Sequence, residues 1–216
     1  MLNFLIYRRG IAAIVGAFIL AAALAAPWVQ AAALSDAETR TLTFMREEEK
    51  LARDVYLTLN DLWSQPVFAN IAKSEQQHMD AMLNLIERYR IADPAIPTVG
   101  LFANTDLQAM HDGLIARGQQ SVTEAFYAGA AIEEIDILDL QEAIAETDKA
   151  DLRQSYENLL AASGNHLRAF VRNIEAQGLV YEPQYLSAEH LEAILSTPTQ
   201  RSGNPGRGGR NGGRGR

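Results

Sequence analysis

The sequence predicts an all-α fold, a bundle of four long helices in which a long crossover joins the second helix to the third. Three observations predict it. Apolar residues between positions 36 and 196 recur at spacings of three and four, which is the period of an amphipathic helix. Prolines and glycines interrupt this pattern at only a few places. The chain has 216 residues, 48% of them hydrophobic, which suits one sizeable domain.

The first hairpin of the bundle is predicted over residues 36–91. The first helix runs from Asp36 to Leu62, and Pro66 favours the first turn of a second helix that continues to about Ile91. The inward stripe of the first helix contains Leu42, Met45, Ala52, Val55, Tyr56 and Leu59, and that of the second contains Ile71, Met79, Met82 and Ile86.

The segment "ADPAIPTVGLFANTD" cannot form a long helix, because it holds two prolines and a glycine. A short helix is expected after it, from Thr105 to Arg117, closed by Gly118. Ser121 and Glu124 have the spacing of a capping box, which opens a third long helix that reaches Glu146.

The fourth long helix is expected to begin at a cap formed by Thr147 or Asp148 and to end at Gln177, before Gly178. Ser187 is expected to cap a last short helix, from Ala188 to Leu195. Short connections join helices 1 and 2 and helices 3 and 4, whereas about 29 residues separate helices 2 and 3. One long crossover at this place is typical of ferritin-like bundles.

The two ends of the chain differ from its middle. Arg8 and Arg9 precede an apolar run and small residues, a pattern that predicts a signal peptide over residues 1–33, cleaved near 31–33. An uncleaved membrane anchor is the alternative. Either interpretation places the folded part outside the cytoplasm, in the periplasm of a bacterium. Residues 197–216 are rich in Gly and Arg and are expected to be disordered. Such a tail suits an anionic surface, the protein's own acidic body or simple solubilisation better than nucleic acid.

Acidic and imidazole side chains fall on the inward stripe of every long helix. The first helix offers Glu49 or Glu48, because Glu47 points away, and the third offers Glu133 with Asp136, with Glu134 as the alternative to Glu133. The candidates on the second and fourth helices are Glu75, His78 and His166. The chain contains no cysteine, which excludes disulfides, thiolate chemistry, Cys-ligated zinc and iron–sulfur centres.

Each candidate taken alone has an ordinary interpretation as a solvated charge or a hydrogen-bonded core residue. Their occurrence on all four helices is harder to explain in that way, because buried carboxylates without positive charge are very unfavourable. Two divalent cations would supply that charge. Four small residues are expected to leave space for the ions, namely Ala52, Ala72, Gly129 and Gly164.

The pattern Glu49, Ala52, Tyr56 followed by Glu75 and His78 resembles the ferritin-like rubrerythrin and erythrin proteins. Together, "EEEKLARDVY", "NIAKSEQQHMDAM", "GAAIEEIDILDL" and "SGNHLRAF" resemble more closely a prokaryotic domain-of-unknown-function family assigned to the ferritin-like group. The resemblance covers residues 38–186. It implies a ferritin-like bundle with two carboxylate-bridged metal ions, iron in most such proteins, with manganese and zinc as alternatives.

The resemblance also implies roles for single residues. Glu49 becomes the ligand on the first helix, Glu75 a bridging carboxylate and His78 a terminal ligand. On the later helices Glu133, Asp136 and His166 become the ligands, and Tyr56 becomes a donor to a carboxylate. Sites of this type act on hydrogen peroxide or dioxygen, so an oxidase or peroxidase is expected.

Two departures weaken the peroxidase assignment more than the metal assignment. Ser163 stands where the fourth helix should carry a Glu three residues before His166, and no Cys₄ module is present. The rival expectation is therefore a module that binds or stores metal, or a partner, without catalysis. A metal-free bundle and a homodimer also remain open. Asp54 and Asp80 are candidate hydrogen-bond acceptors for the histidines, whereas His111 and His190 are expected at the surface.

Overall fold

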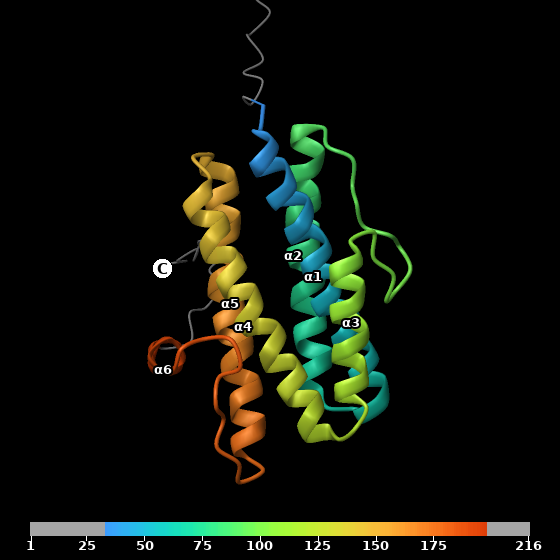
Figure 1. The fold of residues 1–216 in the computed structure, drawn as a ribbon, viewed down its shortest axis with the longest axis vertical. Helices are drawn as coiled ribbons and strands as arrows, with labels where there is room; N and C mark the ends of the chain where they lie inside the picture. The colour runs from blue at the N-terminus through green and yellow to red at the C-terminus, as the bar shows by residue number, and fades with distance from the viewer. Residues whose placement is uncertain (1–32, 198–216) are drawn as a thin grey trace, which may run out of the picture. The chain divides into compact units, whose positions relative to one another are not determined.

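The computed structural model describes residues 33–197, which form six helices and no strand. The predicted all-α helical bundle is confirmed. Its four long helices are α1 (Asp36–Trp63), α2 (Pro66–Tyr89), α4 (Val122–Glu146) and α5 (Ala150–Glu175), and the two shorter ones are α3 (Thr105–Gly118) and α6 (Ala188–Ser196) (Figure 1). None of these helices combines the length and the apolarity that a membrane span needs. The signal peptide predicted over residues 1–33 and the Gly/Arg-rich tail predicted over residues 197–216 lie outside the described part, apart from residues 33 and 197 themselves.

The long helices pack as two hairpins, α1 with α2 and α4 with α5, as the short connections predicted. Figure 1 shows that α4 starts at the end of the bundle where α2 starts, because the chain returns along the bundle between them. That crossover contains α3, which packs along α1 and α4. The indole Nε1 of Trp63 donates to the Gly118 carbonyl at 2.8 Å, which joins the end of α1 to the end of α3.

Helix ends follow the predicted signals at most positions. Ser187 accepts from the His190 amide at α6, as predicted, and α1 has in addition a reciprocal capping box formed by Ser35 and Glu38. Ser121 accepts from the Glu124 amide, but the Glu124 carboxylate pairs with Arg117 at 2.7 Å. The predicted capping box at α4 is therefore only half formed.

The prediction for the start of the fourth long helix was wrong by one or two residues. The N-cap of α5 is Lys149, which makes no side-chain cap bond. Thr147 instead accepts from the Lys149 amide and donates to Glu38 at 2.8 Å. This long-range contact joins the connection before α5 to the first turn of α1. The same helix ends at Glu175, before the turn in which Gly178 adopts φ +79°.

The interior consists of two apolar clusters at different depths of the bundle. One is rich in aromatic residues, with Tyr56, Phe68, Phe126 and Phe170 among its members. The other is mostly aliphatic and contains Leu42, Met45, Met82, Leu85, Leu140, Leu152 and Leu159. In every long helix the sequence positions between the two clusters carry buried polar side chains, and we call this level the polar layer: Glu49, Glu75, His78, Glu133, Asp136, Ser163 and His166.

Candidate metal centre

Five of the predicted ligands meet in the polar layer. Glu49 comes from α1, Glu75 and His78 from α2, Glu133 from α4 and His166 from α5. The three carboxylates are at most 2% exposed and both histidines are 9% exposed. The local reason is helical periodicity, because Glu75 and His78 are one turn apart on the face that also carries Ile71 and Met82.

The five side chains form two groups that share one carboxylate. Glu49, Glu75 and His78 offer ligand atoms that all lie within 4.8 Å of one another, and so do Glu75, Glu133 and His166. The Nδ1 atom of His78 lies 2.6 Å from Glu75 Oε2, and that of His166 lies 2.8 Å from Glu75 Oε1. Each oxygen of Glu75 thus faces a different histidine.

The outer members of each group lie slightly farther away. His78 Nδ1 is 3.1 Å from Glu49 Oε2, and His166 Nδ1 is 3.4 Å from Glu133 Oε2. The two imidazole rings are roughly parallel, with their centroids 5.7 Å apart. Both histidines therefore point Nδ1 inward, and the outer nitrogen of His78 lies 3.4 Å from the Ser74 hydroxyl.

Buried ligand atoms in the two groups have few hydrogen-bond partners among the described residues. Glu49 Oε1 has none, and Glu75 Oε1 and His166 Nδ1 lie 2.8 Å from each other within the same groups. Most buried polar atoms in folded proteins are hydrogen-bonded, and three carboxylates in one small buried volume need positive charge beside them. Carboxylate oxygens and imidazole nitrogens together suit iron, manganese or zinc. The residues present therefore fit a pair of divalent metal ions.

Without metal, the negative charge of the three carboxylates in the two groups is offset in part by protons kept on the two histidines. Burial disfavours the charged imidazole of His166, yet the neighbouring carboxylates Glu75 and Glu133 raise its pKa to about 10. The pKa of His78 is likewise well above its usual value, against the effect of burial, because of Glu49 and Glu75. Burial raises the pKa of Glu49 to about 7. A metal ion must therefore displace protons in order to bind here.

Tyr56 occupies the place predicted for it. Its hydroxyl donates to Glu133 Oε1 at 2.6 Å, and the Gly129 carbonyl lies 3.3 Å from the same hydroxyl. Burial and the negative charge of Glu133 raise the pKa of Tyr56 well above its ordinary value, so the phenol keeps its proton. Tyr56 thereby fixes one oxygen of Glu133 and leaves the other facing His166.

Asp136 lies in the polar layer but outside both groups. One of its carboxylate oxygens accepts from the Ser163 hydroxyl, which also donates to the Leu159 carbonyl at 2.9 Å. The serine that stands where a fourth-helix Glu was expected therefore donates to Asp136 on α4. The other oxygen of Asp136 is buried without a partner.

The structure distinguishes between the paired alternatives left by the sequence. Glu49 and Glu133 belong to the two candidate metal-ligand groups, whereas Glu48 and Glu134 do not. Glu134 instead accepts from the Tyr181 hydroxyl and from backbone amides of the segment before α6. Glu47 points away from the centre, as predicted, but it is buried under the crossover and accepts from the Ala103 amide at 2.7 Å.

Other sequence expectations about the surroundings of the site were wrong. Asp54 does not contact a histidine, because it pairs with Lys50 at 2.5 Å and with Arg53 at 2.7 Å. Asp80 accepts from Gln76 at 2.8 Å. The residue that does contact the outer nitrogen of His78 is Ser74, and its i, i+4 spacing was the only sequence signal for this contact.

Of the two glycines expected to leave room for metal, Gly129 serves a different close contact. A Cβ atom on Gly129 would lie 2.5 Å from the Phe170 ring, and one on Gly164 would be nearest to Arg168 and Ile194. Gly129 thus permits close packing of α4 on α5. His111 was expected at the surface but is 9% exposed, packed beside Phe102 with a ring-centroid distance of 5.4 Å.

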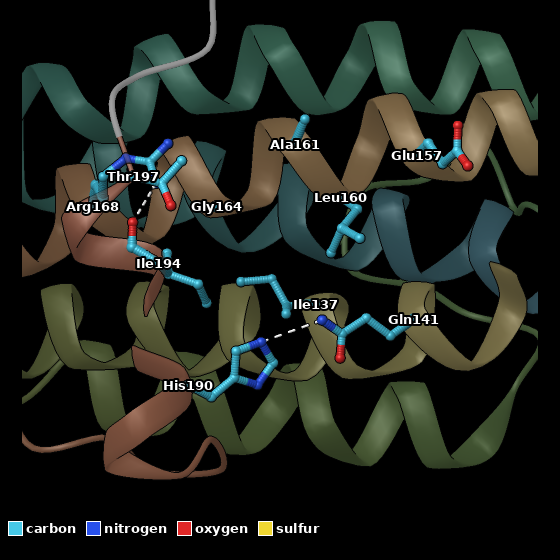
Figure 2. A pocket seen from close by; sticks show the side chains of 10 residues that line it. All are labelled: Ile137, Gln141, Glu157, Leu160, Ala161, Gly164, Arg168, His190, Ile194 and Thr197. Atoms are coloured by element: carbon cyan, nitrogen blue, oxygen red, sulfur yellow. Dashed lines mark hydrogen bonds between the residues drawn. The ribbon is translucent and has the colours of Figure 1, made fainter. Parts of the chain in front are cut away.

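A pocket of about 320 Å³ lies between α4, α5 and α6 (Figure 2). Arg168, Ile194 and Thr197 border one part of it, and Gln141 bonds His190 across another part. None of the residues lining this pocket belongs to the two metal-ligand groups. The pocket is thus separate from the candidate centre.

Comparison with known proteins places this architecture among uncharacterized relatives. The family model described as "Uncharacterized protein domain (DUF2202)" matches residues 38–198. The uncharacterized protein MJ0754 of Methanocaldococcus jannaschii is 46% identical over 172 residues, which cover 79% of this chain and 93% of that protein. The crystal structure of hypothetical protein MJ0754 matches with a TM-score of 0.76, and the match covers 78% of this chain and 97% of that one.

Proposed function

Because the chain belongs to the DUF2202 family, and because the family match contains the whole polar layer, we propose that it is a ferritin-like dimetal carboxylate protein. It would bind two divalent ions, and iron is the first candidate. Manganese and zinc are the alternative ions. The observation that carries the proposal is Glu75, whose two oxygens face two separate histidines within two ligand groups. A structural ion pair would need only one of those groups.

The ligand roles follow from the distances. Glu49 and His78 would hold one ion, Glu133 and His166 would hold the other, and Glu75 would serve both. The crossover and the hairpin arrangement of the four long helices support the ferritin-like assignment. Asp136 remains a reserve ligand, since its free oxygen lies in the same layer.

An iron pair bound here would supply the electrons for reducing hydrogen peroxide or dioxygen, so we propose an oxidase or peroxidase activity. The contribution of the chain is to hold the ligands and to control protons. Tyr56 keeps Glu133 in one orientation through a 2.6 Å hydrogen bond. The apolar clusters on both sides of the layer limit access of water, which strengthens the electrostatic interactions inside.

The proposal also includes a cellular location for the protein. The basic and apolar N-terminal segment favours export to the periplasm, with the domain either released or anchored. A small oxidant would be the substrate in that compartment. A homodimer is compatible with a helical bundle, and the Arg/Gly-rich tail would suit an anionic surface.

Metal analysis tests the binding claim. The protein is purified after growth with excess iron, and its metal content is measured by mass spectrometry beside a Glu75→Gln variant and a Glu157→Gln control. We expect about two ions per chain in the wild type and the control, and a large loss in Glu75→Gln. A wild-type content below about 0.2 ions per chain would contradict the proposal.

Ser163 is the observation that favours a second candidate, a non-catalytic module that binds or stores metal. It binds Asp136 in place of providing a bridging carboxylate. Peroxide consumption by the iron-loaded protein separates the two candidates. Turnover well above that of the same concentration of free iron supports the enzyme, whereas equal turnover supports the storage or binding module.

A further inference from the structure

Buried carboxylates continue outward from the metal-ligand groups toward one face of the bundle. Asp136 on α4 and Glu48 on α1 are 7% and 3% exposed, and they interact electrostatically with each other and with Glu49. Glu48 also lies within hydrogen-bonding reach of Asp139, which is half-buried. These residues form a series, which we call the acidic file: Asp136, Glu48 and Asp139.

The acidic file has a hydroxyl donor in Ser163 but no basic side chain paired with it among the described residues. Glu48 Oε2 and Asp136 Oδ1 are buried and have no hydrogen-bond partner. No Lys or Arg within the described residues forms an ion pair with Glu48, Asp136 or Asp139. Like charges at this spacing repel strongly in a poorly hydrated interior. The two orphan oxygens therefore favour a positive ion in the file.

The outer end of the file opens into a pocket. Asp139 is one of its lining residues, and the pocket, about 230 Å³ in volume, lies between the first half of α1 and the last half of α4. Glu142 and Glu146 also line it and are exposed, and Arg40 is the only basic residue among the lining residues. An acidic pocket concentrates cations near its mouth.

We propose that the acidic file is an accessory cation site through which divalent metal ions pass from the α1–α4 pocket to the dimetal centre. This inference rests on the proposed function, because it assigns the route by which that centre is filled. Ions would be held between Glu48 and Asp139 and then by Asp136, whose neighbours Glu49 and Glu133 are ligands of the centre. The file gives a buried site a polar connection to solvent.

Loading kinetics test the route. The metal-free protein is mixed with Zn²⁺, or anaerobically with Fe²⁺, and uptake is followed against a chromophoric chelator until the final number of ions per chain is reached. For the double variant Glu48→Gln with Asp139→Asn we expect loading at least about tenfold slower, with an unchanged endpoint. The control, Glu157→Gln with Glu192→Gln, removes two charges from other pockets and should load at the wild-type rate.

The possible outcomes separate this inference from the proposed function. Wild-type loading rates in the double variant would overturn the route while leaving the centre intact. A lower endpoint in that variant would also overturn it, because Glu48 or Asp139 would then be a permanent ligand. A wild type that takes up no metal contradicts the proposed function itself. Should the double variant fail to fold, Glu142→Gln with Glu146→Gln at the exposed rim must slow uptake and weaken its salt dependence.

Discussion

Two sets of buried carboxylates in this bundle differ in the hydrogen-bond donors that the chain supplies to them. Glu134 is fully buried and accepts from four donors, the Tyr181 hydroxyl at 2.7 Å and the amides of Gln184, Tyr185 and Leu186 at 2.8, 2.6 and 3.1 Å. Glu49 and Glu75 are almost as deeply buried, yet Glu49 Oε1 has no hydrogen-bond partner and the contacts of Glu75 are with the two histidines of the polar layer.

This difference indicates which buried carboxylates need a ligand from outside the chain. Glu134 shows that this fold can satisfy a buried carboxylate with its own amides when the role is to fasten a segment to the bundle. The polar layer has no backbone amides to offer, because every helix there bonds its own backbone. Its carboxylates can be compensated only by protonated histidines or by cations.

The change with the largest expected effect is Glu75→Ala, because it removes the carboxylate shared by both groups. We expect both ions to be lost, so that the melting temperature no longer responds to added metal or to chelator. The wild type should lose at least about 10 °C when its metal is removed. Differential scanning calorimetry with and without chelator measures this. A metal-dependent melting temperature in Glu75→Ala would show that Glu75 is not the bridge.

Glu134→Ala removes the buried carboxylate that the chain satisfies with its own donors. It leaves the Tyr181 hydroxyl and three amides without their acceptor, which we expect to cost about 3 kcal/mol of unfolding free energy. This loss should be the same for metal-free and metal-loaded protein, and the number of bound ions should not change. Urea denaturation of both forms measures it. A change in metal stoichiometry would mean that the two sets of carboxylates are not independent.

The stability of the metal-free protein should fall as pH rises. The folded-state pKa of Glu49, about 7, exceeds its ordinary 4.5, and that of His166, about 10, exceeds its ordinary 6.5. The folded state therefore binds more protons than the unfolded state between about pH 4.5 and pH 10, and stability decreases through that window, by about 2 kcal/mol or more.

Metal loading should reverse this trend, because bound ions replace those protons. Urea unfolding at several pH values, for metal-free and zinc-loaded samples, provides the measurement. The Glu134→Ala variant is the control, since it should keep the slope of the wild type in both forms. A metal-free stability that rises between pH 5 and pH 9 would contradict the charge arrangement inferred for the layer.

Tyr56→Phe should have the smallest effect. It removes the 2.6 Å hydrogen bond to Glu133 and leaves the packing against Phe170 in place. We expect a loss of about 1 kcal/mol in unfolding free energy, two bound ions still present, and a metal affinity lower by about tenfold. Competition with a chelator of known affinity measures the last quantity. An unchanged affinity would show that Tyr56 does not position its carboxylate.

Much of the architecture could be predicted from the sequence, because it depends on local signals. The helical period, the proline and glycine breaks and the unequal connections gave the four long helices and the crossover. The positions of Glu75, His78 and His166 followed from the same period. Glu49 could not be separated from Glu48, because both are close to the inward stripe and the choice depends on how α1 is rotated against α4.

The errors concern contacts made across the chain. Asp54 pairs with Lys50, and Lys50 also donates to the carbonyls of Thr98 and Leu101 in the crossover. No helical pattern encodes where that crossover passes. His111 is buried for the same reason, since Gly100, at φ +77°, brings the crossover against its ring. The partners of Asp136 and Glu134 likewise come from distant segments.

The placement of the polar layer between two apolar clusters also bears on how the bundle moves. In most helical proteins the ends of the helices fray and their middle parts are the most stable. Here the apolar clusters lie on both sides of the polar layer. In the metal-free protein we therefore expect local opening to be most frequent at the polar layer, where amide hydrogen exchange should be fastest. Bound metal ions would link all four long helices at this level, so amide exchange in the polar layer should become the slowest in the molecule instead of the fastest.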